Sequence, residues 1–156
     1  MSGFTGAGIL PTTVTTTQQA PLGFILTVPD GNNGNKEYMY VYNDSGSTLA
    51  IKEMVMRKSQ SQTYAAAKAE ANCVSARVLG VPETAIPNGS YGFVVRRGVT
   101  TVSAGEALAV DIPLKIHSTV GTVADAVAST LGGDIGQSLA AVGGAGDAVV
   151  FLSCKG

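Results

Sequence analysis

Residues 76–102 read ARVLGVPETAIPNGSYGFVVRRGVTTV, and apolar and polar residues alternate along much of this segment. Alternation with a period of two is the pattern of a β-strand with one buried face. The dipeptide Asn88-Gly89 favours the positive φ angles of a hairpin turn. The segment holds no acid, base or metal ligand at a spacing that suggests catalysis. We therefore predict a β-hairpin whose role is structural.

Strand patterns recur at short intervals on both sides of this hairpin. The run EYMYVY places Tyr38, Tyr40 and Tyr42 on one face of a strand and Met39 and Val41 on the other. Proline and glycine interrupt the strands at a frequency typical of a sandwich or barrel. We predict an all-β chain with a single compact β-barrel or sandwich domain. The other predicted strands are residues 22–28, 49–56, 74–81, 91–97, 99–102, 107–110, 114–117 and 148–152.

Two segments leave the choice of secondary structure open. Residues 59–73, SQSQTYAAAKAEANC, are rich in alanine and favour a helix by propensity, but their apolar periodicity is weak. One short helix and a long loop near 59–72 are therefore both retained. Apolar residues between 120 and 131 recur at helical spacing, and a pair of strands is the alternative there.

The first twenty residues differ from the rest of the chain because they carry no charge and few large apolar side chains. Such a segment buries too little apolar area to offset its ordering entropy alone. A frayed tail is one interpretation. The other is an extended arm (1–20) that orders on a neighbouring subunit, ahead of a β-barrel domain (21–156). The predicted contact residues of the arm are Phe4, Ile9, Leu10, Pro11 and Val14.

Composition limits the classes of partner. Charged residues make up 13% of the 156, hydrophobic residues 45%, and tryptophan is absent. A surface with so few charges is expected to be covered by partners. The net charge of −1 lacks the basic footprint of a nucleic-acid-binding protein. No apolar run is long enough for a transmembrane helix, and the N-terminus lacks the pattern of a signal peptide. We expect neither nucleic acid nor membrane as a partner, and synthesis in a reducing cytosol.

Residue types that carry chemistry occur without the partners they need. Cys73 and Cys154 are predicted to be two buried thiols, and a zinc site lacks further ligands because His117 is the single histidine. Residues 30–37 resemble a calcium loop, but Gly34 stands where an oxygen ligand is required. We predict no catalytic residue, no metal and no cofactor, and an enzyme is the last of the hypotheses.

Arg96-Arg97 is the one local concentration of charge. Neighbours on a strand point to opposite faces, so only one of the two is expected to face the interior side of the sheet. A solvated pair is one interpretation of these residues. The functional alternative is an ion pair with an acidic partner surface, and we retain Arg96 and Arg97 as candidate contacts.

The segment quoted first, followed by SAGEALAVDIPL, VGTVADAV and IGQSLAAVGGAGDAVVFLSC, resembles the small β-barrel decoration, or cement, proteins of tailed-bacteriophage heads. The likeness covers residues 75–153, whereas residues 1–20 and 59–72 have no counterpart, and Pro82 and Pro87 interrupt the pattern. The matching positions are Gly80-Val81, Gly89, Tyr91-Gly92, Arg97-Gly98, Gly105, Ala107 to Val110, Ile135-Gly136 and Leu139.

The resemblance implies a virion structural protein without catalysis. Proteins of this family bind the exterior of the expanded capsid, commonly as trimers, and brace neighbouring subunits of the major capsid protein. By this likeness the chain is a homotrimer on the capsid exterior, made in the cytoplasm of a host bacterium, with the major capsid protein as partner. The alternative is another virion component, such as a head-fibre base, a tail-associated protein or a glycan-binding barrel module.

Overall fold

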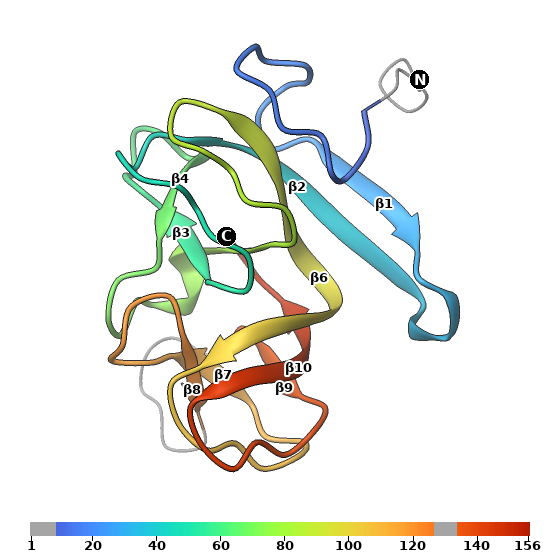
Figure 1. Cartoon of the computed structure of the whole chain (residues 1–156), viewed down its shortest axis with the longest axis vertical. Helices are drawn as coiled ribbons and strands as arrows, with labels where there is room; N and C mark the ends of the chain where they lie inside the picture. The colour runs from blue at the N-terminus through green and yellow to red at the C-terminus, as the bar shows by residue number, and fades with distance from the viewer. Residues whose placement is uncertain (1–8, 127–133) are drawn as a thin grey trace.

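The computed structural model describes residues 9–126 and 134–156, and within them it forms one mixed β-sheet with no α-helix (Figure 1). The all-β prediction is confirmed. Two single turns of 3-10 helix occur at Gly31–Asn33 and Ser75–Arg77. The strands are β1 (Ile25–Pro29), β2 (Asn35–Asn43), β3 (Val55–Arg57), β4 (Ala65–Lys68), β5 (Val78–Pro82), β6 (Tyr91–Ala104), β7 (Leu114–Ile116), β8 (Val123–Asp125), β9 (Gly136–Ser138) and β10 (Gly146–Ser153).

Five strands form a closed barrel. The pairings run from β2 to β4, β3, β5 and β6, and β6 pairs with β2 again. Each of the five strands contributes to one buried apolar cluster, which is the expected interior of such a ring. The buried members of this cluster are Met39, Val41, Leu49, Val55, Ala66, Leu79, Ile86 and Val94.

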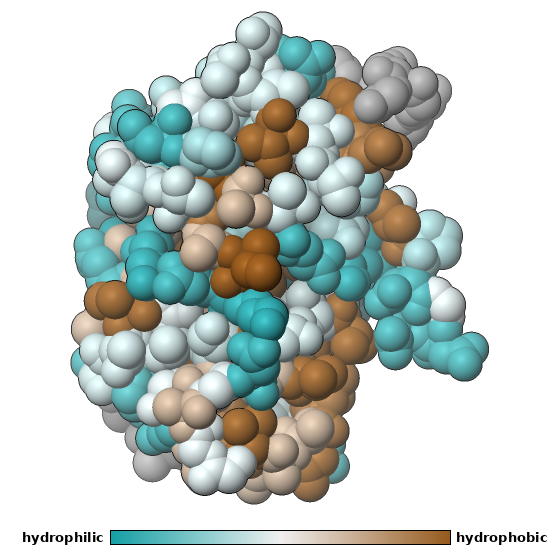
Figure 2. All heavy atoms as spheres, in the orientation of Figure 1, coloured by the Kyte–Doolittle hydropathy of each residue, from teal (hydrophilic) through white to brown (hydrophobic). Residues whose placement is uncertain are grey.

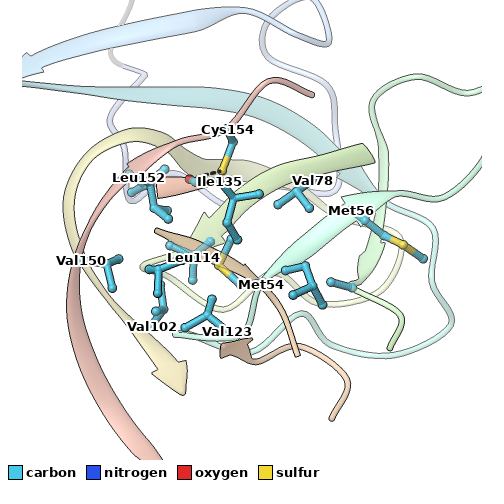
Figure 3. Close-up of a cluster of buried hydrophobic side chains, with 14 of the residues drawn as sticks. Met54, Met56, Val78, Val102, Leu114, Val123, Ile135, Val150, Leu152 and Cys154 are labelled. Carbon is cyan, nitrogen blue, oxygen red and sulfur yellow. Dashed lines mark hydrogen bonds between the residues drawn. The ribbon is translucent and has the colours of Figure 1, made fainter. Parts of the chain in front are cut away.

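A second and larger apolar cluster lies on the other side of β6. Tyr38 and Tyr40 belong to it, whereas Met39 and Val41 lie inside the barrel, so the predicted two faces of this strand are confirmed. Figure 3 shows the lower part of this cluster, where Val102, Leu114 and other apolar side chains converge from β6, β7, β8 and β10. Every residue that the figure labels is buried to at least 96%.

The long strand β6 belongs to both parts of the molecule. Its first half pairs with β2 up to Arg97, and its second half, from Arg97 to Ala104, pairs with β10. A register shift opposite Glu37 and Tyr38 leaves Arg96 as an extra residue, which is a β-bulge. Residues 91–97 and 99–102, which we predicted as two strands, are therefore one strand with a bulge at the junction.

The alanine-rich segment is not helical. Residues 65–68 form β4, which pairs with β2 on one side and β3 on the other, and the rest of 59–73 is loop and turn. The loop alternative is closer to the structure, and the helix was wrong. Ala66 is fully buried inside the barrel, where a larger side chain would crowd the interior. Pairing with two strands outweighs the helix propensity of a short alanine run.

Other strand boundaries also differ from the predictions. Of residues 49–56, only Val55 and Met56 belong to a strand, β3, and Leu49 makes an isolated bridge to Ile86. Residues 107–110 are no strand, because Leu108 makes a single bridge to Val142 there. Within 120–131, Val123–Asp125 is β8, while positions 127–131 lie outside the described residues.

The β1–β2 hairpin projects from the body of the molecule, and its tip is hydrophilic (Figures 1 and 2). The carboxylate of Glu83 accepts hydrogen bonds from residues near the turn end of β2. Tyr38 donates to Glu83 over 2.7 Å, Lys36 over 3.0 Å and Thr100 over 2.9 Å. Burial and the hydrogen bond to Glu83 raise the pKa of Tyr38 well above its usual value. The hairpin is thus fixed to β6 and to the loop that follows β5.

Candidate interaction surface

The second half of β6 has one buried and one open face. Gly98, Thr100, Val102 and Ala104 are buried, and the residues between them face outward. The neighbouring strand β10 shows the same alternation, with Ala148, Val150 and Leu152 buried. The outward residues of β6, β10 and β9 therefore share one surface. We call it the outer face, and it consists of Arg97, Val99, Thr101, Gln137, Val149, Phe151 and Ser153.

The centre of the outer face is apolar. Val99 lies directly opposite Phe151, and Val149 lies opposite Thr101, with an exposed fraction of 43%. Leu139, which is 39% exposed, adjoins Val149 through a backbone hydrogen bond. Figure 2 shows hydrophobic side chains gathered over the middle of β6 and β10. A contiguous apolar group on an exposed sheet face is the usual mark of an interaction site.

Polar groups border this apolar centre. Lys52 and Asp147 form an ion pair at one end, with 2.5 Å between Nζ and Oδ2. Gln137 donates to Asp111 over 3.1 Å at the other side. A cavity of about 270 Å³ lies next to Phe151, and Pro113 and Gly136 also line it. An apolar centre with a polar rim is the anatomy of a protein–protein interface.

The two predicted arginine contacts have different environments. The Arg96 side chain is 30% exposed, and its Nε lies 3.9 Å from Oε2 of Glu37. It also donates to the carbonyl of Cys154 over 3.4 Å, so it ties β6 to β2 and to the C-terminal residues. Arg97 is exposed and forms no ion pair with any residue that the structure describes. Of the two, Arg97 lies on the outer face.

The predicted arm residues that the structure describes lie along the chain's own barrel. Ile9 packs against the larger cluster and Val14 against the barrel interior cluster, while Pro11 is half-buried. Leu10 is 61% exposed, and Phe4 lies outside the described residues. The contact of an arm with a neighbouring subunit stays a prediction.

Backbone and side-chain bonds hold the end of this segment in place. Thr15 pairs with Tyr91 through two backbone hydrogen bonds, of 2.8 and 3.1 Å. The backbone N–H of Gln19 donates to the Tyr40 hydroxyl over 3.0 Å, and Ala20 is buried. Residues 15–20 therefore belong structurally to the barrel.

The structure describes the surroundings of His117, Cys73 and Cys154, the residues we weighed for chemistry. Nδ1 of His117 accepts a hydrogen bond from the Thr119 backbone, and its Nε2 lies 3.9 Å from Glu106. Cys73 and Cys154 are free and buried, as predicted, and burial raises the pKa of the Cys154 thiol to about 12. Such a thiol is protonated at neutral pH and is a poor nucleophile.

The loop that resembles a calcium site forms a hairpin turn. Gly31 and Gly34 have φ angles of 56° and 81°, and Asn33 donates to Asp30 within the turn. Within residues 9–126 and 134–156, no three or more histidine, cysteine, aspartate or glutamate side chains cluster in a way that would hold a metal ion. No helix in the same residues is long and apolar enough to cross a membrane.

The outer face was not predicted, although the sequence contains a signal for it. Residues 148–152, AVVFL, are apolar at every position rather than at alternate ones. A strand that is apolar on both faces is normally covered on both. In this structure one face of β10 packs on the core and the other is open.

These features define an all-β barrel domain whose sheet continues beyond the barrel through β6, β10 and β9 and carries an exposed apolar face. No protein-family model matches the chain, and no curated protein matches it. A solved structure with a similar fold is the head fiber gp8.5 N base of bacteriophage phi29, with a TM-score of 0.55 and 13% identity. The match covers 74% of this chain and 94% of the phi29 chain. At this identity, the likeness establishes a shared fold.

Proposed function

We propose that this chain is a structural protein of a bacteriophage head, a base module that attaches to the capsid. The observation that carries the proposal is the fold shared with nearly the whole of the phi29 head-fibre base. The sequence resemblance of residues 75–153 to head decoration proteins is a second, independent argument for a place in the phage head. Attachment to the major capsid protein and assembly as a homotrimer are parts of this proposal.

The outer face is the proposed capsid contact. Its centre of Val99, Val149 and Phe151 presents apolar area with little charge to desolvate. Arg97 supplies a positive charge without an ion-pair partner among the described residues, and an acidic group on the capsid would complement it. Each contact can be weak, because three copies held together engage the capsid with a high effective concentration.

A decoration protein that braces the lattice is the second candidate. The glycine positions of the resemblance favour it, because three of them lie where strands approach closely. Gly80, Gly98 and Gly136 have φ angles of 152°, 120° and 155°, and an added Cβ at Gly80 or Gly136 would lie within 2.3 Å of a backbone carbonyl oxygen.

Quantitative gel analysis of purified virions separates the two candidates. A decoration protein approaches the abundance of the major capsid protein, and a fibre base is present in far fewer copies. The common proposal is tested by sedimenting the purified full chain with heads that lack it. We expect the protein to sediment with the heads. Failure to bind mature heads, with the N-terminus intact, would contradict the proposal.

A further inference from the structure

A hollow at the end of β2 is built differently from the outer face. Tyr42 is the penultimate residue of β2, Ala65 begins β4, and the backbone N–H of Tyr42 donates to the carbonyl of Tyr64 over 3.0 Å. The hollow has a volume of about 350 Å³, within the range of small-ligand pockets, which begins at roughly 300 Å³. We call it the tyrosine hollow, and it is lined by Leu22, Tyr42, Gln62, Thr63, Tyr64 and Ala65.

Both tyrosine rings of the hollow are held in place by their neighbours. A Cβ added to Gly23 would lie 2.5 Å from Cζ of Tyr64, so this ring packs directly against the Gly23 backbone. The Tyr42 ring lies 4.7 Å from the ring of Tyr91, which in turn stacks at 6.0 Å on the buried ring of Tyr40. Rings fixed in this way lose little freedom when a ligand binds.

The side-chain polar groups around the hollow have no hydrogen-bond partner among the residues that the structure describes. The hydroxyls of Tyr42, Thr63 and Tyr64 and the side-chain amide of Gln62 form no hydrogen bond with any other described residue. Leu22 and Ala65 supply apolar surface between them. A ligand that fits must therefore offer both hydroxyl-type hydrogen-bonding groups and a flat apolar face.

The absence of charged side chains among the six lining residues of the hollow excludes further classes of ligand. None of its six lining residues is ionisable near neutral pH, so neither an anion nor a cation would find a counter-charge there. A neutral sugar ring satisfies all of these conditions, because its C–H face is apolar and its edge carries hydroxyls. We infer that the tyrosine hollow is a binding site for an uncharged pyranose, with its C–H face against the tyrosine rings.

The hollow lies apart from the outer face. Tyr42 lies one residue before the end of β2, whereas Glu37, near its start, is paired with Arg97. Tyr42 lies five positions after Glu37 along the extended strand, a distance of roughly 17 Å. A sugar can therefore enter the hollow while the outer face is occupied. The inference rests on the hollow alone and holds whether or not the chain binds a capsid.

Saturation-transfer NMR on the purified full chain tests this inference. The probes are the methyl pyranosides of glucose, galactose, mannose and N-acetylglucosamine, with glucuronate and a proline-rich peptide as competing classes. We expect at least one neutral pyranoside to bind with a Kd of roughly 1–5 mM, as follows for a ligand of about a dozen heavy atoms. Saturation should be strongest on the C–H face of the ring.

Two glutamines of the same loop provide a matched pair of variants. Gln62 lines the hollow, whereas Gln60 lines a separate cavity beside Arg57. We expect Gln62→Ala to weaken sugar binding about fivefold or more and Gln60→Ala to leave it unchanged. Tyr64→Phe keeps the ring against Gly23 and should weaken binding through loss of the hydroxyl alone. Thermal unfolding of each variant confirms that it is folded.

Three results would overturn the inference. The first is that none of the neutral pyranosides receives saturation from the protein. The second is that glucuronate or the proline-rich peptide binds more tightly than every neutral sugar, since aromatic grooves also accept polyproline helices. The third is an equal effect of the two glutamine substitutions, which would place the sugar elsewhere on the surface.

Discussion

The replacement Val149→Ser tests the outer face directly. Val149 is 43% exposed in the free protein. Complete burial of a valine side chain contributes about 2 kcal/mol, so covering the exposed part contributes about 1 kcal/mol per copy. Loss of this amount weakens one contact roughly fivefold. If three copies engage the head together, the losses add to about 3 kcal/mol, or roughly 150-fold in affinity.

The matched control is Val74→Ser, because Val74 is 42% exposed but lies outside the outer face. Both variants are sedimented with heads over a series of protein concentrations, after circular dichroism has shown equal thermal stability. We expect the Val149 variant to require much higher concentrations for half-saturation and the Val74 variant to behave as the unmodified chain. Equal binding of the two variants would show that the outer face does not contact the capsid.

Three further predictions concern the barrel, the buried thiol and the N-terminus. Gly80→Ala places a Cβ 2.1 Å from the Val95 carbonyl oxygen and should lower the free energy of unfolding by about 2–5 kcal/mol. Gly89→Ala should lower it by about 1 kcal/mol, because Gly89 has open space around it and only a positive φ. Urea unfolding measures both variants, and equal losses would contradict the close approach of the strands at Gly80. The pKa of the Cys154 thiol is about 12 in the folded protein and about 9 in the unfolded chain. The unfolded chain therefore loses this proton first, and the free energy of unfolding falls as the pH rises from about 9 to about 12. Urea unfolding at pH 8 and pH 10.5 should show about 2 kcal/mol more loss for the unmodified chain than for Cys154→Ser, and identical losses would refute this. Deletion of residues 1–8 should weaken sedimentation with heads, and unchanged binding would refute the role of these residues as a capsid-binding arm.

The alternation of residue types predicted side-chain positions best for β2, a strand with two buried faces of different composition. The alternation in EYMYVY predicts tyrosines on one face and Met39 and Val41 on the other, and the structure places Tyr38 and Tyr40 in one cluster and Met39 and Val41 in the other. This prediction is reliable because the pleat of a strand fixes the side of each residue, whatever the partner strands are.

Local patterns failed where tertiary pairing decides the outcome. Residues 65–68 are good helix formers, yet they form β4 because β2 and β3 provide hydrogen-bonding partners on both edges. The bulge at Arg96 is also invisible to alternation, since it depends on the register between β6 and β2. The sequence predicted that only one of the two arginines faces the interior side, and the structure identifies this residue as Arg96, which is partly buried beside Glu37, whereas Arg97 is exposed.

The candidate sites were harder to predict than the fold. The outer face combines residues from β6, β9 and β10, and the tyrosine hollow combines Leu22 with the loop at 62–64. Neither set is contiguous in the sequence, and neither has a fixed spacing. Only the uninterrupted apolar run at 148–152 indicated that a second covered face was required.

The continuity of β6 has a mechanical consequence. One unbroken strand is bonded to the barrel through β2 over its first half and to the outer-face sheet through β10 over its second half (Figure 1). A pull between barrel and outer face along this strand would load both sets of hydrogen bonds in shear, so many bonds must break together. If the two parts were joined by a hinge instead, their hydrogen bonds would break one at a time. The architecture therefore suits a part that must transmit force without separating.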